Sequence, residues 1–386
     1  MKHKCPIGNV CVNTEGGHFC WPNYRHHIAL LIPLGTGLAV AILIFVAMGV
    51  WVWRKLKNIK ERKMKQIFFK RNGGLLLQQQ ISSYAARLLL ELTLFKIEEL
   101  EKATDKFSEN RILGKGGLGT VYKGMSSDGR IVAVKKANII DVSQVAQFIN
   151  EVFILAQINH RNIVKLFGCC LETEVPLHVY EYVSNGTLSN HLHDKSNIST
   201  ISWENRLRIA AEIAGALAYL HSSATTAIFH RDIKSSNILL DQNYKAVISD
   251  FGLSRSVSID KTHLTTLVGG TFGYLDPEYF QSGQLNDKSD VYAFGVVLAE
   301  ILTGQKAISS GRDDMGLASW FRLAEAVVLE GKEEEIFAVA KLAKICLKIN
   351  ARKRPTMKEV AAELDQLRKT KEIPGHQESF AWSGPM

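Results

Sequence analysis

The stretch HRDIKSSNILLDQNYKAVISDFG, from His230 to Gly252, decides the fold of this chain. Two short apolar runs inside it, ILL and AVIS, predict a pair of strands. Their pairing would place Asn237 and Asp250 at one end of a hairpin, with Asp232 in the same cleft. Amide and carboxylate oxygens near phosphates suit Mg²⁺. The stretch therefore predicts a magnesium and phosphate site.

A glycine-rich run, GKGGLGTV, extends from Gly114 to Val121. Glycines let the backbone approach a phosphate closely and point its N–H groups at it. A dinucleotide-binding site of the Rossmann type would open a helix after the third glycine. Here Val121 continues into a strand, so the run indicates a phosphate-covering hairpin and the Rossmann interpretation fails.

Two charged residues of opposite sign lie downstream of this run. Lys135 ends the apolar run VAVK, so its ammonium is expected in a cleft. Glu151 shares one face of an expected helix with the apolar residues Phe148 and Leu155. A carboxylate on an apolar face is costly unless it meets a cation. The sequence therefore predicts an ion pair between Lys135 and Glu151.

The remaining pattern predicts a small β-rich part followed by a larger α-rich part. A turn at Ser127-Asp128-Gly129 indicates a hairpin. The strands expected before Ser202 are Val121–Met125, Ile131–Lys135, Ile163–Phe167 and Leu177–Tyr182, and the helices there are Ile97–Phe107 and Val142–Ile158. Beyond Ser202 the chain is expected to be mainly helical, with helices at Arg206–His221 and Asp290–Leu302.

These motifs, in this order, resemble the signature set of eukaryotic protein kinases. The stretches Ile149–Leu177 and Gly270–Leu298 closely resemble the plant wall-associated receptor kinases and wall-associated-kinase-like proteins. The resemblance implies an α+β, bilobal protein-kinase fold with a small β-rich N-lobe and a large α-rich C-lobe, preceded by one transmembrane helix.

The resemblance also implies ATP and Mg²⁺ as cofactors and a role for each matching position. Asp232 accepts the proton of a substrate hydroxyl, and Asn237 and Asp250 hold Mg²⁺. Lys234 is the residue type that similar enzymes use for Ser/Thr substrates, and Lys135 pairs with Glu151. The implied ATP contacts are Leu113, Gly114, Gly116, Gly119, Val121, Ala133, Lys135, Glu181 and Val183, with Tyr180 as gatekeeper.

Structural and regulatory roles follow from the same resemblance. Glu278 is expected to pair with Arg354, and Asp290 to support the turn at His230–Asp232. Arg231, a cation beside Asp232, suits an activation loop that becomes ordered when phosphorylated. The regulatory residues expected in addition to Arg231 are Thr265 or Thr266, as the main phosphorylation site, and Thr271, which shapes the substrate platform.

Charge and hydropathy place the chain at a membrane. Ile28–Trp53 carries no charge and is long enough to cross the roughly 30 Å hydrocarbon core as a helix. The formal net charge is +9, and Arg54–Arg71 holds nine basic residues and one acidic residue. This basic segment, Arg54–Arg71, is called the basic collar below. Next to an apolar span it indicates the cytoplasmic side of a lipid bilayer and not a nucleic-acid interface. No signal peptide is expected before the span, which then acts as a signal-anchor unless the chain begins inside a longer ectodomain.

The expected domains are an extracellular remnant at 1–27, a transmembrane helix at 28–53, a juxtamembrane segment at 54–106, a kinase domain at 107–368 and a C-terminal tail at 369–386. Residues 59–90 are expected to form a linker. Three cysteines, Cys5, Cys11 and Cys20, lie outside, so one lacks an intrachain partner. The run Cys11–Cys20 resembles the middle of an EGF-like module, but an unstructured remnant is favoured.

Two functions remain open. One is a single-pass, plasma-membrane receptor-like kinase that phosphorylates Ser/Thr of protein substrates in cell-surface signalling, with a possible extracellular ligand or co-receptor. The other is a kinase-fold signalling scaffold, or pseudokinase, disabled either by the segment 305–335, which is shorter than the family pattern, or by the missing ectodomain. Every residue of the catalytic set is present, which favours the enzyme.

Overall fold

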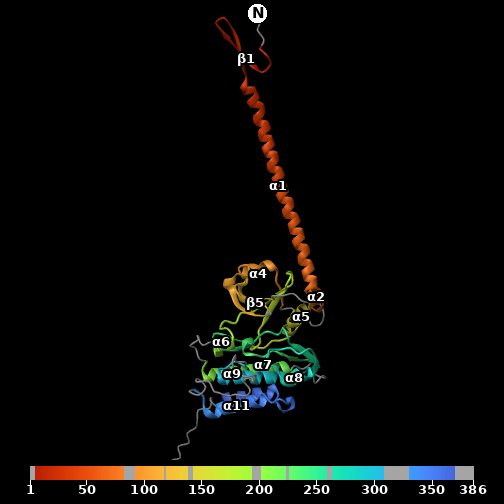
Figure 1. Cartoon of the computed structure of the whole chain (residues 1–386), viewed down its shortest axis with the longest axis vertical. Coiled ribbons are helices and arrows are strands. Elements are labelled where there is room, and N and C mark those ends of the chain that lie inside the picture. Colours follow the sequence, from red (N-terminus) through yellow and green to blue (C-terminus); the bar gives the residue numbers. More distant parts are fainter. Residues whose placement is uncertain are drawn as a thin grey trace, which may run out of the picture. The chain divides into compact units, whose positions relative to one another are not determined.

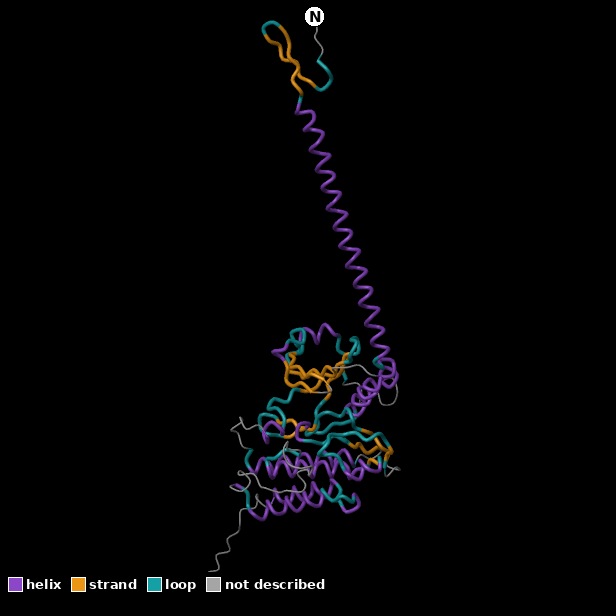
Figure 2. Tube along the Cα trace, viewed as in Figure 1, coloured by secondary structure: helices purple, strands orange, loops and turns teal. Residues whose placement is uncertain are grey.

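The computed structural model describes residues 5–81, 92–116, 119–137, 142–193, 201–222, 226–258, 263–307 and 330–369. The chain divides into two compact units, Met1–Ile67 and Phe68–Met386. Figure 1 follows the chain through both units, and Figure 2 separates its helices from its strands.

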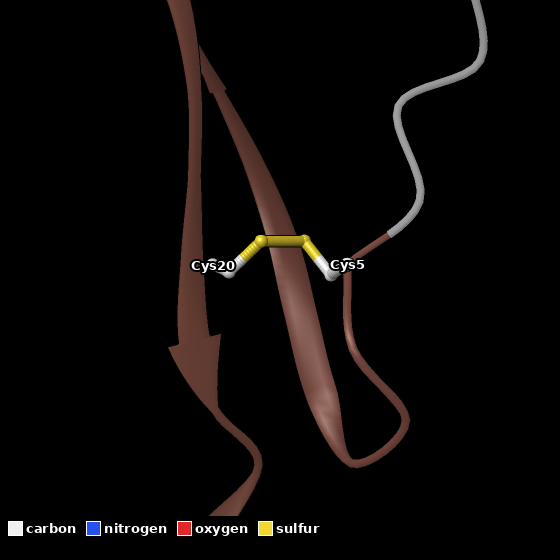
Figure 3. The surroundings of a disulfide bond; sticks show 2 residues. All are labelled: Cys5 and Cys20. Atoms are coloured by element: carbon white, nitrogen blue, oxygen red, sulfur yellow. A yellow bond between two sulfur atoms is a disulfide. The ribbon is translucent and has the colours of Figure 1, made fainter.

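The first unit opens with a β-hairpin, where an unstructured remnant was expected. Strands β1 (Asn9–Thr14) and β2 (Gly17–Pro22) pair antiparallel around a tight turn that contains Gly16 at φ +118°. A positive φ at such a turn favours glycine. A disulfide joins Cys5 to Cys20 on β2 (Figure 3), and the Cys11 thiol is free and exposed.

A long helix, α1 (Tyr24–Arg71), follows the hairpin. Its stretch Thr36–Arg71 contains an apolar window with mean hydropathy 2.2 and is long and apolar enough to cross a membrane, by length and composition. The helix continues through the basic collar, because Lys, Arg and Glu are good helix formers. The described part of the linker expected over 59–90 is thus helical: α1 ends at Arg71, Gly73 follows at φ +80°, and α2 (Gly74–Ile81) comes next. Residues 82–91 lie outside the described part.

In the second unit, the N-lobe is built on a six-stranded sheet in the order β3-β7-β8-β6-β5-β4. All neighbours pair antiparallel except β3 and β7. The strands are β3 (Thr93–Leu94), β4 (Ile112–Gly116), β5 (Gly119–Met125), β6 (Ile131–Ala137), β7 (Leu166–Cys170) and β8 (Leu177–Glu181). Two helices belong to this lobe, α4 (Ile97–Ala103) and α5 (Val142–Ala156).

The strand expected at Ile163–Phe167 begins later than expected, at Leu166. The residues before it instead join the other lobe, where Ile163 bridges Ile248 and the Val164 N–H donates to the Ile248 carbonyl at 2.9 Å. The chain thus uses this apolar run first to connect the lobes and only then to extend the sheet.

The C-lobe is mainly helical. Its helices are α6 (Leu188–His193), α7 (Trp203–His221), α8 (Pro277–Ser282), α9 (Asp287–Thr303), α11 (Glu333–Cys346) and α12 (Met357–Lys369). Helix α9 is buried almost all round, as its sequence predicted, with Asn286 capping its start and Gly304 (φ +64°) its end. Short hairpins pair β9 (Thr226–Phe229) with β12 (Arg255–Ser258), β10 (Ile238–Leu240) with β11 (Ala246–Ile248), and β13 (Leu264–Thr265) with β14 (Gln284–Leu285).

The α+β bilobal expectation is confirmed by this arrangement, in which the six-stranded sheet forms the core of one lobe and most of the helices lie in the other (Figure 2). Most of the shortened segment at 305–335 lies outside the described residues, which resume at Glu330. The same holds for the tail beyond Lys369.

One expected ion pair is wrong. Arg354 pairs with Asp276 at 2.6 Å, not with Glu278, and both partner side chains are buried. Glu278 instead accepts from the Ala351 N–H at 2.6 Å. Asp276 caps the start of α8, so its carboxylate is turned toward the core, whereas Glu278 lies two residues into the helix.

Candidate active site

The hairpin of β10 and β11 gathers the polar residues that the sequence singled out. Ile238 pairs with Ile248, so Asn237 and Asp250 lie at the same end of the hairpin, as expected. The Ser249 N–H and hydroxyl both donate to the Asn237 carbonyl at 2.9 Å and fix this end. Asp250 has φ +67°, a strained conformation for a residue other than glycine. Such strain is retained where the surroundings impose it, and it is frequent at functional sites.

Asp232 is held by three side chains. The Lys234 ammonium donates to its Oδ2 at 2.7 Å, and the Thr271 hydroxyl donates to its Oδ1 at 2.6 Å. The Asn237 amide donates to its main-chain carbonyl at 2.9 Å. The Lys234 ammonium also reaches the Thr271 hydroxyl at 2.8 Å. These contacts fix the direction of the Asp232 carboxylate and keep a cation beside it.

Lys135 joins the two lobes electrostatically. Its ammonium lies 2.7 Å from Asp250 and 3.8 Å from Glu151, so the expected pair with Glu151 is present. Burial alone would lower the pKa of Lys135, but the two carboxylates outweigh it and hold the pKa above its ordinary value. For Asp250, burial acts to raise the pKa, and the nearby ammonium of Lys135 more than offsets it. Lys135 and Asp250 are therefore both charged near neutral pH.

Two residues of β8 complete the surroundings of Glu151. The Tyr180 hydroxyl donates to Glu151 Oε1 at 2.7 Å, a contact that its expected place as gatekeeper did not include. The His178 ring lies between Phe148 and Tyr180, with ring centroids at 4.1 and 5.4 Å. Burial lowers the pKa of His178 to about 4, so the imidazole is neutral. Alternate residues of a strand lie on the same face of the sheet, so His178 and Tyr180 both lie on one face of β8.

The glycine-rich run forms the hairpin of β4 and β5, with Gly116 opposite Gly119 and Gly114 opposite Val121. A Cβ on Gly119 would lie 2.5 Å from the Lys136 carbonyl oxygen, so a larger residue cannot fit without moving β6. Val121 lies opposite Lys135 in the neighbouring pair of strands. Gly117 and Leu118, at the tip, lie outside the described residues.

The other expected ATP contacts lie around the same sheet. Ala133 on β6 is opposite Tyr180 on β8, and Glu181 ends β8. Val183 follows β8 and is half-buried, whereas Leu113 on β4 is exposed. The sheet register therefore places Ala133 and Glu181 on the two paired strands β6 and β8, and Lys135 lies on β6, whereas Val183 lies just after β8 and Leu113 lies on the edge strand β4.

The turn at His230–Asp232 is supported by Asp290, as expected. Its carboxylate accepts from the main-chain N–H groups of His230 and Arg231, both at 2.8 Å, and from the His221 ring at 2.9 Å. Burial acts against the Asp290 charge, but these donors outweigh it and lower the pKa. Arg231 is thereby held at φ +70°.

The Arg231 guanidinium faces the activation segment. It donates to the carbonyls of Leu253 and Leu267 at 3.1 and 2.7 Å, and to the Tyr279 hydroxyl at 2.6 Å. Its Nε is buried and has no hydrogen-bond partner among the described residues. Thr265 is exposed on β13, and Thr266 donates its N–H to the Gly283 carbonyl at 3.2 Å.

Sequence reasoning missed a buried polar cluster around Glu300 of helix α9. The Glu300 carboxylate accepts from the Tyr274 hydroxyl at 2.8 Å and from the Ser235 hydroxyl at 3.1 Å, and it lies 2.9 Å from the His193 ring. Burial and this carboxylate raise the pKa of Tyr274. A glutamate inside the apolar helix α9 was the signal available in the sequence, since a buried carboxylate needs partners.

The donor set fits Mg²⁺ and a nucleotide. Mg²⁺ keeps several waters and takes one or two protein carboxylates together with substrate phosphates, and Asn237 and Asp250 supply two oxygen-bearing side chains at one hairpin end. Among the described residues, no group of three or more His, Cys, Asp or Glu forms an all-protein metal site. The close-packed Gly119 and the charged Lys135 match the needs of bound phosphates.

Comparison with known proteins agrees with this geometry. The family model "Protein kinase domain" matches residues 107–364. Wall-associated receptor kinase-like 1 of Arabidopsis thaliana is 50% identical over 387 residues, which is 96% of this chain and 53% of the relative. Wall-associated receptor kinase-like 10 is 52% identical over 379 residues (94% and 48%), and wall-associated receptor kinase 1 is 47% identical over 391 residues (95% and 53%), both from Arabidopsis thaliana.

The chain spans about half the length of the curated relatives it matches. With most of its length covered by a protein kinase domain, the chain belongs to the protein kinase family, among the wall-associated receptor kinases and kinase-like proteins.

Proposed function

We propose that this chain is a membrane-anchored protein kinase that transfers the γ-phosphate of ATP to Ser or Thr of protein substrates. The observation that carries the proposal is the Asp232 carboxylate, held at 2.6–2.7 Å by Thr271 and Lys234. A carboxylate fixed beside a cation can accept the proton of a substrate hydroxyl while the cation offsets phosphate charge.

The residues divide the work of phosphoryl transfer, which depends on positioning and on charge neutralisation more than on covalent chemistry. Mg-ATP, when bound, supplies the phosphoryl group, and Asn237 and Asp250 would hold the metal. Lys135, oriented by Glu151, would bind the α- and β-phosphates beneath the hairpin of β4 and β5. The glycines of that hairpin would let its backbone lie close to the phosphates.

The membrane arrangement is part of the proposal. The basic collar after the apolar helix supports a single pass, with the N-terminus outside and the kinase domain on the cytoplasmic side of the plasma membrane. The disulfide between Cys5 and Cys20 agrees with an oxidising compartment for the hairpin. An extracellular ligand or co-receptor would act on that side.

Regulation by phosphorylation is proposed at Thr265 or Thr266. The Nε of Arg231, which has no hydrogen-bond partner among the described residues, supports this, because a phosphate on the segment 253–275 offers acceptors for a buried guanidinium. Thr271 is instead occupied by Asp232 and Lys234. Mass spectrometry of active protein should find phosphate on Thr265 or Thr266; active protein with neither modified would contradict this assignment.

The test is phosphate incorporation by the full chain in lipid nanodiscs with Mg-ATP. The wild type should phosphorylate itself and a Ser/Thr protein substrate, and Asp232→Asn should lower the rate by about 10²–10⁴-fold. Asp365→Asn, on helix α12, where the Asp365 side chain is 46% exposed, is the matched control and should keep the rate. A wild type without transfer, in folded form, would favour the scaffold.

A further inference from the structure

The segment between the membrane helix and the N-lobe is not a free linker. Asn72 is fully buried, and its amide donates to the carbonyls of Leu171 and Thr173 at 3.1 and 2.8 Å. The Arg71 guanidinium donates to the Glu174 carbonyl at 2.5 Å. These three carbonyls belong to the turn between β7 and β8, so the end of α1 is fixed to the N-lobe by side-chain hydrogen bonds.

Helix α2 then packs into the core. Leu77 is 1% exposed and belongs to the main hydrophobic core, together with Val152 and Leu155 of α5. Its neighbours Leu75 and Leu76 are 55% and 58% exposed. One leucine of three is therefore buried, and the helix has a defined docked face.

The contact with α5 is close. Gly73 has φ +80°, and a Cβ there would lie 2.8 Å from Ile149 Cδ1. On a helix of 3.6 residues per turn, positions two apart point about 200° away from each other. Ile149 therefore lies on the face of α5 opposite Glu151, which faces Lys135. Figure 1 shows α2 next to α5, consistent with this contact.

We propose that the segment Arg71–Ile81, named here the juxtamembrane dock, positions α5 so that Glu151 stays paired with Lys135. Helix α5 is held from both sides: Glu151 is fixed by Lys135 and Tyr180 on one face, and Ile149 is backed by the dock on the other. Asn150 extends the link, because its amide donates to the Ser254 carbonyl at 2.8 Å, just after the Asp250-Phe251-Gly252 motif. Loosening the dock would let α5 move and would break the ion pair part of the time.

The test compares Leu77→Ala with Leu76→Ala in the full chain in nanodiscs, by hydrogen exchange and by phosphate transfer. Losing the buried leucine should speed exchange of α5 amides at least about tenfold, and the exposed change should not. Transfer in Leu77→Ala should slow by a similar factor, and Leu77→Met, which conserves volume, should restore most of it. The α9 amides, far along the chain, report global unfolding.

A second variant keeps the proposal testable if Leu77→Ala unfolds the whole kinase domain. If Leu77→Ala also speeds α9 exchange, Gly73→Ala decides, because it removes no buried group but forces the dock away from Ile149. Unchanged α5 exchange in both variants, or faster α5 exchange with unchanged or faster transfer, overturns the proposal. The measurement of phosphate transfer rests on the proposed kinase function, and the measurement of hydrogen exchange does not. A wild type that transfers no phosphate would contradict the proposed function, and hydrogen exchange alone would then test the role of the juxtamembrane dock.

Discussion

Two buried ion pairs of this protein differ in how completely they are satisfied. Arg354 meets Asp276 in the C-lobe with both side chains at 0–1% exposure, and the carbonyls of Lys348, Lys288 and Ile349 accept its other donors. Lys135 meets Asp250 and Glu151 in a cleft where its own side chain is 18% exposed and that of Asp250 is 26% exposed. A saturated pair can only hold the fold together. A cation that remains partly open to solvent can still take a ligand.

The comparison predicts unequal losses of stability. Arg354→Met strands the buried Asp276 charge and should lower the free energy of unfolding by about 3–5 kcal/mol. Lys135→Met should cost less, about 1–2 kcal/mol, because Tyr180 still donates to Glu151 and water reaches Asp250. Thermal unfolding of the two variants under identical conditions measures this. Equal losses would break the distinction between the two pairs.

The cleft should also make the stability of the protein depend on pH. His178 has a pKa of about 4 when folded and an ordinary value of 6.5. Between these values the unfolded chain binds a proton that the folded chain excludes, so stability falls as the pH falls through this window. From pH 7 to 5 the loss should be about 2 kcal/mol.

The matched variant for this prediction is His178→Phe, which keeps a ring beside Phe148 and does not titrate. The quantity to compare is the change in unfolding free energy between pH 7 and 5 within each protein, so that any constant packing difference cancels. If the variant loses as much stability as the wild type, His178 is not the source of the acid sensitivity.

A smaller effect is expected from the donor on Glu151. Tyr180→Phe removes the hydroxyl that donates to its carboxylate and should lower stability by about 1.5 kcal/mol, the lower end of the range for hydrogen bonds to charged groups. Tyr182→Phe is the control, since its ring packs under the Lys123 ammonium at 4.6 Å and would remain there. Equal melting temperatures for both variants would mean that Lys135 alone holds Glu151.

Much of this site could be predicted from sequence because its residues lie in local motifs. The hairpin that aligns Asn237 with Asp250 follows from two short apolar runs, and the Lys135–Glu151 pair follows from a carboxylate on an apolar helix face. The pairing of Arg354 could not be settled this way, because Asp276 and Glu278 are two acids two residues apart. Only the start of α8 decides which one faces the core.

The packing of the juxtamembrane dock against the N-lobe was harder to predict from the sequence. Its run LLLQQQI is too short to show a period, and its partners at Leu171–Glu174 and Ile149 are distant in the chain. Basic composition and the pair Gly73-Gly74 indicated a linker, and tertiary packing overrode that indication. Because Leu77 is buried by residues distant in the sequence, no local hydrophobic periodicity indicates that it is buried.

The most direct measurement is the rate of phosphate transfer from Mg-ATP by Lys135→Met in the full chain, at a temperature where thermal unfolding shows the variant to be folded. If the open pair exists to hold phosphates, the rate should fall by at least about 10²–10³-fold, the loss seen when one preorganised electrostatic contact is removed. A folded Lys135→Met protein that transfers phosphate at the wild-type rate would contradict the account, because the partly open cation would then have no functional role.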